Sequence, residues 1–178
     1  SIYCQYLTSG NCYSTTTKTI MKWDNYFMGM LPAIAVKSKD VDFKVGAIIV
    51  GPDHEIRSTG YNSFVRGLDD SVAVRFESPE KYTWVEHAER NAIYNAARMG
   101  TALKGCTIYI GANPCLDCAK GIISSGISEV VFSSDGAYTR RERYKSRGKK
   151  HEDVYVQDIQ NVLTMMRECG VIYRSFSG

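Results

Sequence analysis

His87-Ala88-Glu89 and Pro114-Cys115-Leu116-Asp117-Cys118 are the two stretches around which this chain is organised. They supply one imidazole, two thiols at i and i+3, and a carboxylate two residues after the imidazole. A zinc ion with three protein ligands keeps its fourth tetrahedral position for water, as catalytic rather than structural zinc sites do. The sequence therefore predicts a catalytic Zn²⁺ ion bound by His87, Cys115 and Cys118, with Glu89 beside it as the group that moves protons.

Each of these residues has an ordinary explanation when it is taken alone. A single histidine is more often packed or exposed than a ligand, and a C-x-x-C pair can be a redox pair or half of a structural zinc site. A structural site needs a fourth ligand at zinc-finger spacing, which the sequence lacks, and a redox pair leaves His87 and Glu89 without a role. The joint pattern favours the catalytic interpretation.

Hydrophobic runs and turn residues around these stretches predict alternating strands and helices. The helix 23–39 contains Pro32, where we expect a kink or a break. The turn 51–54 joins two strands as a hairpin, and 62–82 is a long polar loop. Strands are predicted over 45–50, 55–61, 106–110, 129–132 and 171–174, and the other helices over 84–99, 115–125 and 154–169, ending at Gly100, Gly126 and Gly170. This order predicts an α/β fold, a three-layer α/β/α sandwich with a central five-stranded mixed sheet.

The basic segment 140–150 is predicted to be a loop between the last two units, and it has two interpretations. Charge runs are usually exposed, so the segment can be a solvated and mobile connection. Its cations can also form a patch that faces the phosphate of a nucleotide.

Composition and length narrow the class of protein. The 178 residues fit one domain, 21–178, and the Ser-, Thr- and Tyr-rich residues 1–20 are interpreted as a tag or a disordered extension before Met21. Cys4 and Cys12 lack the partners that a second metal site needs. A net charge of +3 is too small to indicate a nucleic-acid partner. Without a membrane-length apolar run or a secretory signal pattern, we expect no membrane partner and a reduced, cytoplasmic protein.

The motifs together resemble those of the deoxycytidylate (dCMP) deaminases of bacteria and phages, within the cytidine deaminase superfamily. The H-x-E and P-C-x-x-C elements are common to the zinc-dependent nucleobase deaminases. The loop 60–70 and the helix face with Asn91 and Arg98 narrow the resemblance to dCMP deaminases. The matching segments are 38–40, 45–50, 60–70, 86–98 and 114–119.

The resemblance implies hydrolysis of dCMP to dUMP and ammonia, which supplies dUMP for thymidylate synthesis. Glu89 would take a proton from the zinc-activated water and pass it to the base and then to the leaving ammonia. The resemblance also implies a homohexamer, activated by dCTP and inhibited by dTTP, with Mg²⁺ on the effector triphosphate. Implied substrate contacts are Asn62 at the sugar or base and Ser38, Lys39 and Tyr138 near the 5′-phosphate. Implied effector contacts are Gly60, Tyr61, Asn91, Asn95 and Arg98.

The chain also departs from the family pattern. Ser63, Val65 and Val41 stand where Gly, Pro and Pro are usual, so the loop is expected to follow a different path. Arg98 can equally be a cation that complements the helix dipole. Two other functions share the zinc motif: a nucleic-acid deaminase such as a tRNA adenosine deaminase, and a catalytically inactive deaminase-fold protein of DNA uptake. The modest charge speaks against the first, and the presence of Glu89 against the second.

Overall fold

A computed structural model describes residues 21–178 of the chain. The interpretation of residues 1–20 as an extension, and the question of a metal at Cys4 and Cys12, lie outside the described residues. No helix within 21–178 combines the length and the apolar character needed to cross a membrane.

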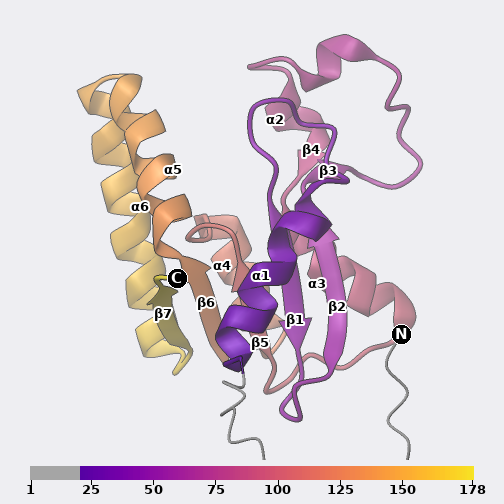
Figure 1. Ribbon diagram of the computed structural model, residues 1–178. Helices are drawn as coiled ribbons and strands as arrows, with labels where there is room; N and C mark the ends of the chain where they lie inside the picture. The colour runs from indigo at the N-terminus through magenta and orange to yellow at the C-terminus, as the bar shows by residue number, and fades with distance from the viewer. Residues whose placement is uncertain (1–20) are drawn as a thin grey trace, which may run out of the picture.

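A mixed sheet of five strands forms the centre of the molecule, in the order β2-β1-β5-β6-β7 (Figure 1). The two antiparallel pairs are β1 with β2 and β1 with β5, whereas β6 runs parallel to both β5 and β7. The strands are β1 (Gly46–Val50), β2 (Ile56–Tyr61), β5 (Thr107–Ile110), β6 (Glu129–Ser133) and β7 (Ile172–Phe176). The predicted five-stranded mixed sheet is confirmed.

Helices cover both faces of this sheet because alternate strand residues point to opposite sides. Ile48 and Val50 of β1 belong to the cluster with the helix α1 (Trp23–Ala35). Ala47 and Ile49 belong to the cluster on the other face. That face is covered by α3 (Ala88–Met99), α4 (Leu116–Ser124) and α6 (Lys149–Glu168). The predicted three layers are therefore present, with one helix on the first face and three on the second.

Helix ends follow the glycine pattern of the sequence. Gly100, Gly126 and Gly170 all have positive φ angles, and Gly100 follows the last residue of α3 in the left-handed conformation that favours glycine. Of the kink or break expected at Pro32, the break does not occur, since α1 continues past it to Ala35 and the Val36 N–H donates to the Pro32 carbonyl. The helix ends four residues before the predicted end at position 39. Leu31 and Ala35 are buried against the sheet on either side of an exposed Pro32, so tertiary packing holds the helix together.

The structure differs from the sequence prediction in two regions. The helix expected from Trp84 begins at Ala88, because 81–84 forms the separate short helix α2 (Lys81–Trp84) and β4 (Val85–Glu86) pairs with β3 (Ser63–Phe64). A 3-10 turn, η1 (Ala73–Phe76), lies in the same loop. The basic segment predicted as a loop is helical, being split between α5 (Ser134–Ser146) and the first residues of α6. Ser133 caps α5, because its hydroxyl accepts a hydrogen bond from the Gly136 N–H at 3.2 Å.

The first helix and the last strand are joined by ion pairs. Arg174 of β7 contacts Asp24 of α1 at 2.7 Å and Glu129 of β6 at 2.6 Å. Phe176 of β7 also packs against the apolar cluster that contains α1. Residues at the two ends of the described chain therefore stabilise the same corner of the fold.

Candidate active site

The predicted zinc ligands come together at the starts of two helices. His87 is the N-cap of α3, Cys115 is the N-cap of α4, and Cys118 lies in the first turn of α4. The His87 Nδ1 atom is 3.5 Å from the Cys115 sulfur and 3.4 Å from the Cys118 sulfur. Two ligands at about 2.0 and 2.3 Å from a tetrahedral zinc ion are about 3.5 Å apart, so the imidazole and the two sulfurs have the spacing of a zinc site.

The two thiols and the imidazole share their protons. A hydrogen bond from the Cys118 thiol lowers the pKa of Cys115 to about 3. The same bond and burial raise the pKa of Cys118 above its usual range. The hydrogen bond with Cys115 raises the pKa of His87. Of the two sulfurs, Cys118 is the one that keeps its proton more strongly, and a metal that binds both sulfurs has to displace that proton.

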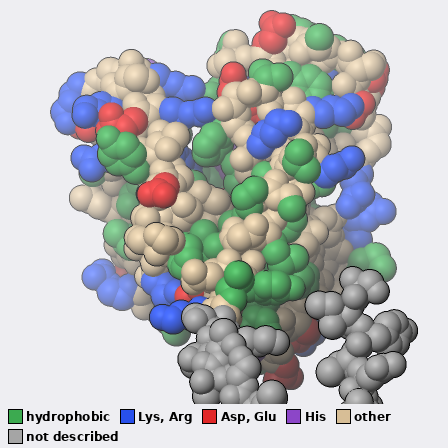
Figure 2. All heavy atoms as spheres, viewed as in Figure 1, with side chains coloured by type: hydrophobic (Ala, Val, Ile, Leu, Met, Phe, Trp, Pro, Cys, Tyr) green, Lys and Arg blue, Asp and Glu red, His purple; other side chains and the backbone are tan. Residues whose placement is uncertain are grey.

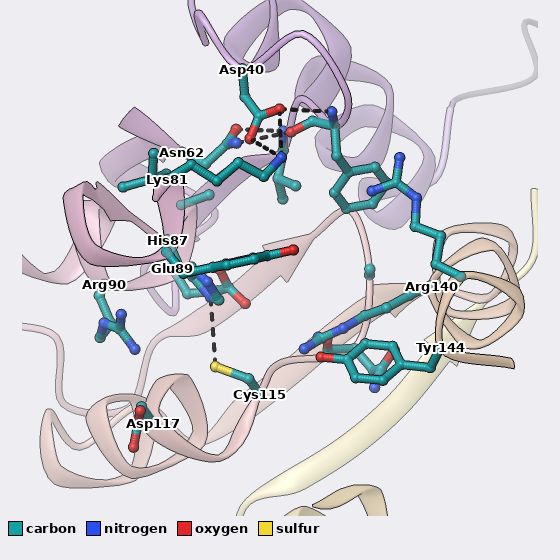
Figure 3. A pocket seen from close by; sticks show the side chains of 18 of the residues that line it. Asp40, Asn62, Lys81, His87, Glu89, Arg90, Cys115, Asp117, Arg140 and Tyr144 are labelled. Carbon is teal, nitrogen blue, oxygen red and sulfur yellow. Dashed lines mark hydrogen bonds and ion pairs between the residues drawn. The ribbon is translucent and has the colours of Figure 1, made fainter. Parts of the chain in front are cut away.

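Glu89 lies next to this group and is not part of it. The His87, Cys115 and Cys118 donor atoms lie within 4.8 Å of one another, and the carboxylates of residues 21–178 add no further member to the cluster. Glu89 is only 6% exposed and lines the same cavity as the metal-binding group. Figure 3 shows its carboxylate beside His87, directed into the cavity. A carboxylate in this place can exchange protons with a molecule held at the metal.

Arg90 faces the metal-binding group from α3. Its guanidinium is paired with Glu86, with Nε 2.6 Å from a carboxylate oxygen, and its Nη1 is 3.9 Å from the Cys118 sulfur. This pair holds a positive charge next to a sulfur that must be a thiolate when it binds zinc.

A cavity of about 350 Å³ opens in front of these residues. One wall comes from the starts of α3 and α4, and the opposite wall is α5, from which Arg140 and Tyr144 face the zinc ligands (Figure 3). Asn62, predicted to contact the substrate, does line this cavity and is 7% exposed. Its amide holds the neighbouring backbone, accepting from the Val45 N–H at 2.8 Å and donating to the Phe43 carbonyl at 2.9 Å.

The residues predicted near the 5′-phosphate lie elsewhere. Ser38 is buried, and its hydroxyl accepts a hydrogen bond from the Asp40 N–H. Lys39 is exposed and forms an ion pair with Asp70 at 2.6 Å, in a second cavity. Tyr138 lies on α5 but is 67% exposed. None of these three side chains lines the cavity with the metal-binding group.

The predicted effector residues lie around the second cavity, of about 240 Å³, or beneath it. Tyr61, Asn91 and Asn95 line it, whereas Gly60 and Arg98 do not. The two asparagine amides also bind α3 to β2, since Asn91 donates to the Tyr61 carbonyl at 2.9 Å and Asn95 to the Thr59 carbonyl at 2.8 Å. The structure thus gives both asparagines a packing role in addition to the one that the resemblance implies.

Several residues that line the cavity were not among the site residues predicted from the sequence. Lys81 and Asn113 lie in segments without a distinguishing motif and reach the cavity only through the tertiary fold. The α5 residues did carry a signal, because positions 140, 143, 144 and 147 have the i, i+3, i+4, i+7 spacing of one helix face. That face is Arg140, Arg143, Tyr144 and Arg147, so its periodicity is basic and aromatic rather than aliphatic.

Comparison with known proteins places this site in a family. A family model described as the cytidine and deoxycytidylate deaminase zinc-binding region matches residues 21–134. The human deoxycytidylate deaminase is 39% identical over 132 residues, which cover 71% of this chain and 73% of the human protein. The deoxycytidylate deaminase of Mycobacterium phage D29 is 34% identical, over 64% of this chain and 95% of the phage protein.

A solved structure agrees with this placement at the level of the fold. The dCMP deaminase of cyanophage S-TIM5, in complex with dCMP and dUMP, superposes with a TM-score of 0.61. That comparison has 21% sequence identity and covers 85% of this chain and 95% of the cyanophage protein. The matched family model contains the whole metal-binding group together with Glu89 and Asn62. The chain therefore belongs to the cytidine and deoxycytidylate deaminases that carry this zinc-binding region.

Proposed function

We propose that this protein is a zinc-dependent hydrolase that deaminates dCMP to dUMP and ammonia. The observation that carries the proposal is the donor spacing of His87, Cys115 and Cys118, with the carboxylate of Glu89 in the same cavity. The relatives named deoxycytidylate deaminase support dCMP as the substrate.

Different residues of the chain are proposed to bind the metal and to transfer protons. His87, Cys115 and Cys118 would hold the zinc ion, and a zinc ion held in this way would supply the activated water for hydrolysis. Glu89 would act as the proton carrier at the base: one proton of the attacking water would go to N3, and the proton of the new C4 hydroxyl would go to the amine, so that ammonia leaves and the C4 carbonyl forms. Because Glu89 is buried, its carboxylate is shielded from competing bulk water during these transfers.

Arg90 has a positioning role in this proposal. Cys118 would be a thiolate when zinc is bound, and the Arg90 guanidinium, 3.9 Å from its sulfur, would stabilise the negative charge on that sulfur. Glu86 keeps that guanidinium in place through its bond to Nε.

Substitution of Glu89 by Gln tests the proposal. Glu89→Gln is expected to lower kcat for dCMP by roughly 10²–10⁴-fold, the usual contribution of a general acid–base. The zinc content, measured by atomic emission, should remain near that of the unaltered protein because Glu89 is not a ligand. Glu168→Gln, an exposed glutamate at the end of α6, is the matched control.

Substrate identity is measured by ammonia release from dCMP, dCTP, deoxycytidine and an RNA hairpin. The proposal expects dCMP to give the highest kcat/KM. Turnover of the hairpin without turnover of dCMP would instead indicate a nucleic-acid deaminase, and zinc binding without any turnover an inactive relative.

Regulation by dCTP and dTTP with Mg²⁺, a hexameric assembly and a cytoplasmic location belong to the same proposal. The cations Lys37, Lys39 and Arg66 around the second cavity support a triphosphate site there. Rate measurements with dCTP or dTTP, in the presence and absence of Mg²⁺, test the effectors, and light scattering after size exclusion tests the assembly. If neither triphosphate changes the rate, the proposed regulation by dCTP and dTTP is wrong, and the proposed deamination of dCMP is unaffected.

A further inference from the structure

The face of α5 that lines the active cavity carries three guanidinium groups. Arg140, Arg143 and Arg147 form no ion pair with residues 21–178. Two cations on other faces of the same helix are paired, Arg141 with Glu152 and Lys145 with Glu142. The remaining cavity cations, Lys81 and Arg90, are paired as well. The uncompensated charge is thus concentrated on one side of the cavity.

The partners of the three arginines are neutral oxygens. Arg140 donates to the Asn113 carbonyl, Arg143 to the Asp42 carbonyl at 2.7 Å, and Arg147 to the Tyr82 hydroxyl at 3.0 Å. The Arg143 guanidinium also lies 4.4 Å from the centre of the Phe43 ring. Hydrogen bonds from a guanidinium to an anionic oxygen are roughly twice as strong as those to a neutral one. An anion that enters the cavity can therefore displace these partners.

The three positions have different neighbours. Arg140 bonds to the residue two before Cys115 and faces Glu89 (Figure 3). Arg143 and Arg147 bond instead to the far rim, at Asp42 and Tyr82. Arg143 and Arg147 lie about one helical turn apart, about 6 Å along the axis of α5, so both guanidinium groups can reach one tetrahedral anion. Figure 2 shows Lys and Arg side chains gathered at the upper left, where α5 ends and α6 begins, beside a hollow in the surface.

A charge count indicates which anion fits. Two thiolates neutralise the charge of a zinc ion, and the guanidinium of Arg140 offsets the carboxylate of Glu89. Lys81 is paired with two carboxylates, Asp40 and Asp42, so one negative charge remains there and offsets one of the two positive charges of Arg143 and Arg147. The cavity thus keeps an excess of positive charge at these two arginines, opposite a phosphate monoester that carries about −1.5 to −2 at neutral pH. We propose that Arg143 and Arg147 bind the 5′-phosphate of the substrate and select the nucleotide over the nucleoside. This inference rests on the proposed function.

Both arginines that we assign to phosphate binding lie on α5. The match to the family model ends at residue 134, and α5 begins at Ser134. Phosphate recognition by Arg143 and Arg147 is therefore built on a segment beyond the part that the family model describes. On binding, the phosphate oxygens replace the Asp42 carbonyl and the Tyr82 hydroxyl, and α5 becomes bound to the ligand rather than to the opposite rim.

The test compares Arg143→Gln, Arg147→Gln and the double variant in the zinc-loaded protein, with dCMP and deoxycytidine as substrates. Each single change is expected to raise KM for dCMP about 10-fold, and the double change 100-fold or more, in line with the loss of charged hydrogen bonds. The values of kcat for dCMP and of kcat/KM for deoxycytidine should stay within about 3-fold. Arg141→Gln, on the same helix but paired with Glu152, is the matched control.

Lysine variants and ligand binding separate recognition from folding. Arg143→Lys and Arg147→Lys keep the charge and lose the forked geometry, so they should recover part of the affinity for dCMP. Titration calorimetry with dUMP measures the same losses without turnover. Equal effects of Arg143→Gln, Arg147→Gln and Arg141→Gln, or a parallel loss for dCMP and deoxycytidine, would overturn the inference. An unaltered protein that binds dUMP through these arginines but does not deaminate dCMP would overturn the proposed function alone.

Discussion

At the scale of single residues, Gly60 shows how tightly the helix that carries His87 and Glu89 is seated on the sheet. A Cβ at position 60 would lie 2.3 Å from the Ala88 carbonyl oxygen and 2.4 Å from the Ala92 nitrogen. Both atoms are backbone of α3, so they cannot move aside as a side chain would. Only glycine lets β2 and α3 come this close.

Substitution at Gly60 should therefore be costly. Gly60→Ala is expected to lower the free energy of unfolding by about 1–3 kcal/mol or more, as overpacking does in well-packed cores. Urea unfolding monitored by circular dichroism gives the value. Gly29→Ala is the control, because a Cβ there meets nothing within 4 Å inside α1 and should stabilise the protein by about 0.5–1 kcal/mol. Similar effects of the two changes would contradict the packing argument.

The proton sharing between Cys115 and Cys118 predicts how metal binding depends on pH. The raised pKa of Cys118 keeps one thiol proton in place, and the raised pKa of His87 adds an imidazolium proton as the pH falls. Zinc binding to the metal-free protein should release about one proton at pH 8 and more below pH 7. Calorimetry in buffers of different ionisation enthalpy counts these protons, and a count that does not change with pH would contradict the prediction.

The residues around the cavity fall into two groups, those that belong to a local sequence pattern and those that do not. His87, Glu89, Cys115 and Cys118 form a short, local pattern in which spacing alone limits the chemistry. Asn113 reaches the cavity because a loop places it there, and its buried oxygen accepts a hydrogen bond from Tyr155, a residue that is 42 positions away. Contacts of this kind depend on the assembled fold, and no local sequence pattern predicts them.

At the scale of elements, the strands with continuous apolar runs and the C-terminal ends of the helices that stop before a glycine were predicted correctly, whereas two of these helices begin at other residues than predicted. Both signals are local and strong, since β1 is buried on both faces and Gly100 has a φ of 66°. The helix α5 was missed because it has no buried residue and no apolar face. Its position depends on its packing against α6 and on the arginine contacts across the cavity.

Ligand binding should therefore be detectable in α5 as an element. Saturating dUMP is expected to slow amide hydrogen exchange several-fold over 134–147 and over 40–43, where the opposite rim lies. The strand β7 should exchange at an unchanged rate, because it lies away from the cavity lining. Exchange followed by mass spectrometry distinguishes these segments, and slowing confined to β7 or α1 would place the ligand elsewhere.

At the scale of the whole molecule, the zinc site joins α3 to α4 but lies outside the two apolar clusters of the sheet. The fold should therefore survive removal of the metal with reduced stability. A free zinc concentration 100- to 1,000-fold above Kd contributes about 2.7–4.1 kcal/mol, so chelation should lower Tm by roughly 5–15 °C. Calorimetry with and without chelator measures the shift, and a metal-free protein without a cooperative transition would show that zinc is needed for folding itself.

The ion pair between Asp24 and Arg174 has a consequence for how the chain is made. The two residues are 150 positions apart, and Phe176 packs on the same side of the sheet as α1. During synthesis α1 emerges from the ribosome long before its partners on β7 do. The first helix therefore remains incompletely anchored after the zinc-binding region, residues 21–134, has been made, and this corner of the domain is completed only when β7 has emerged.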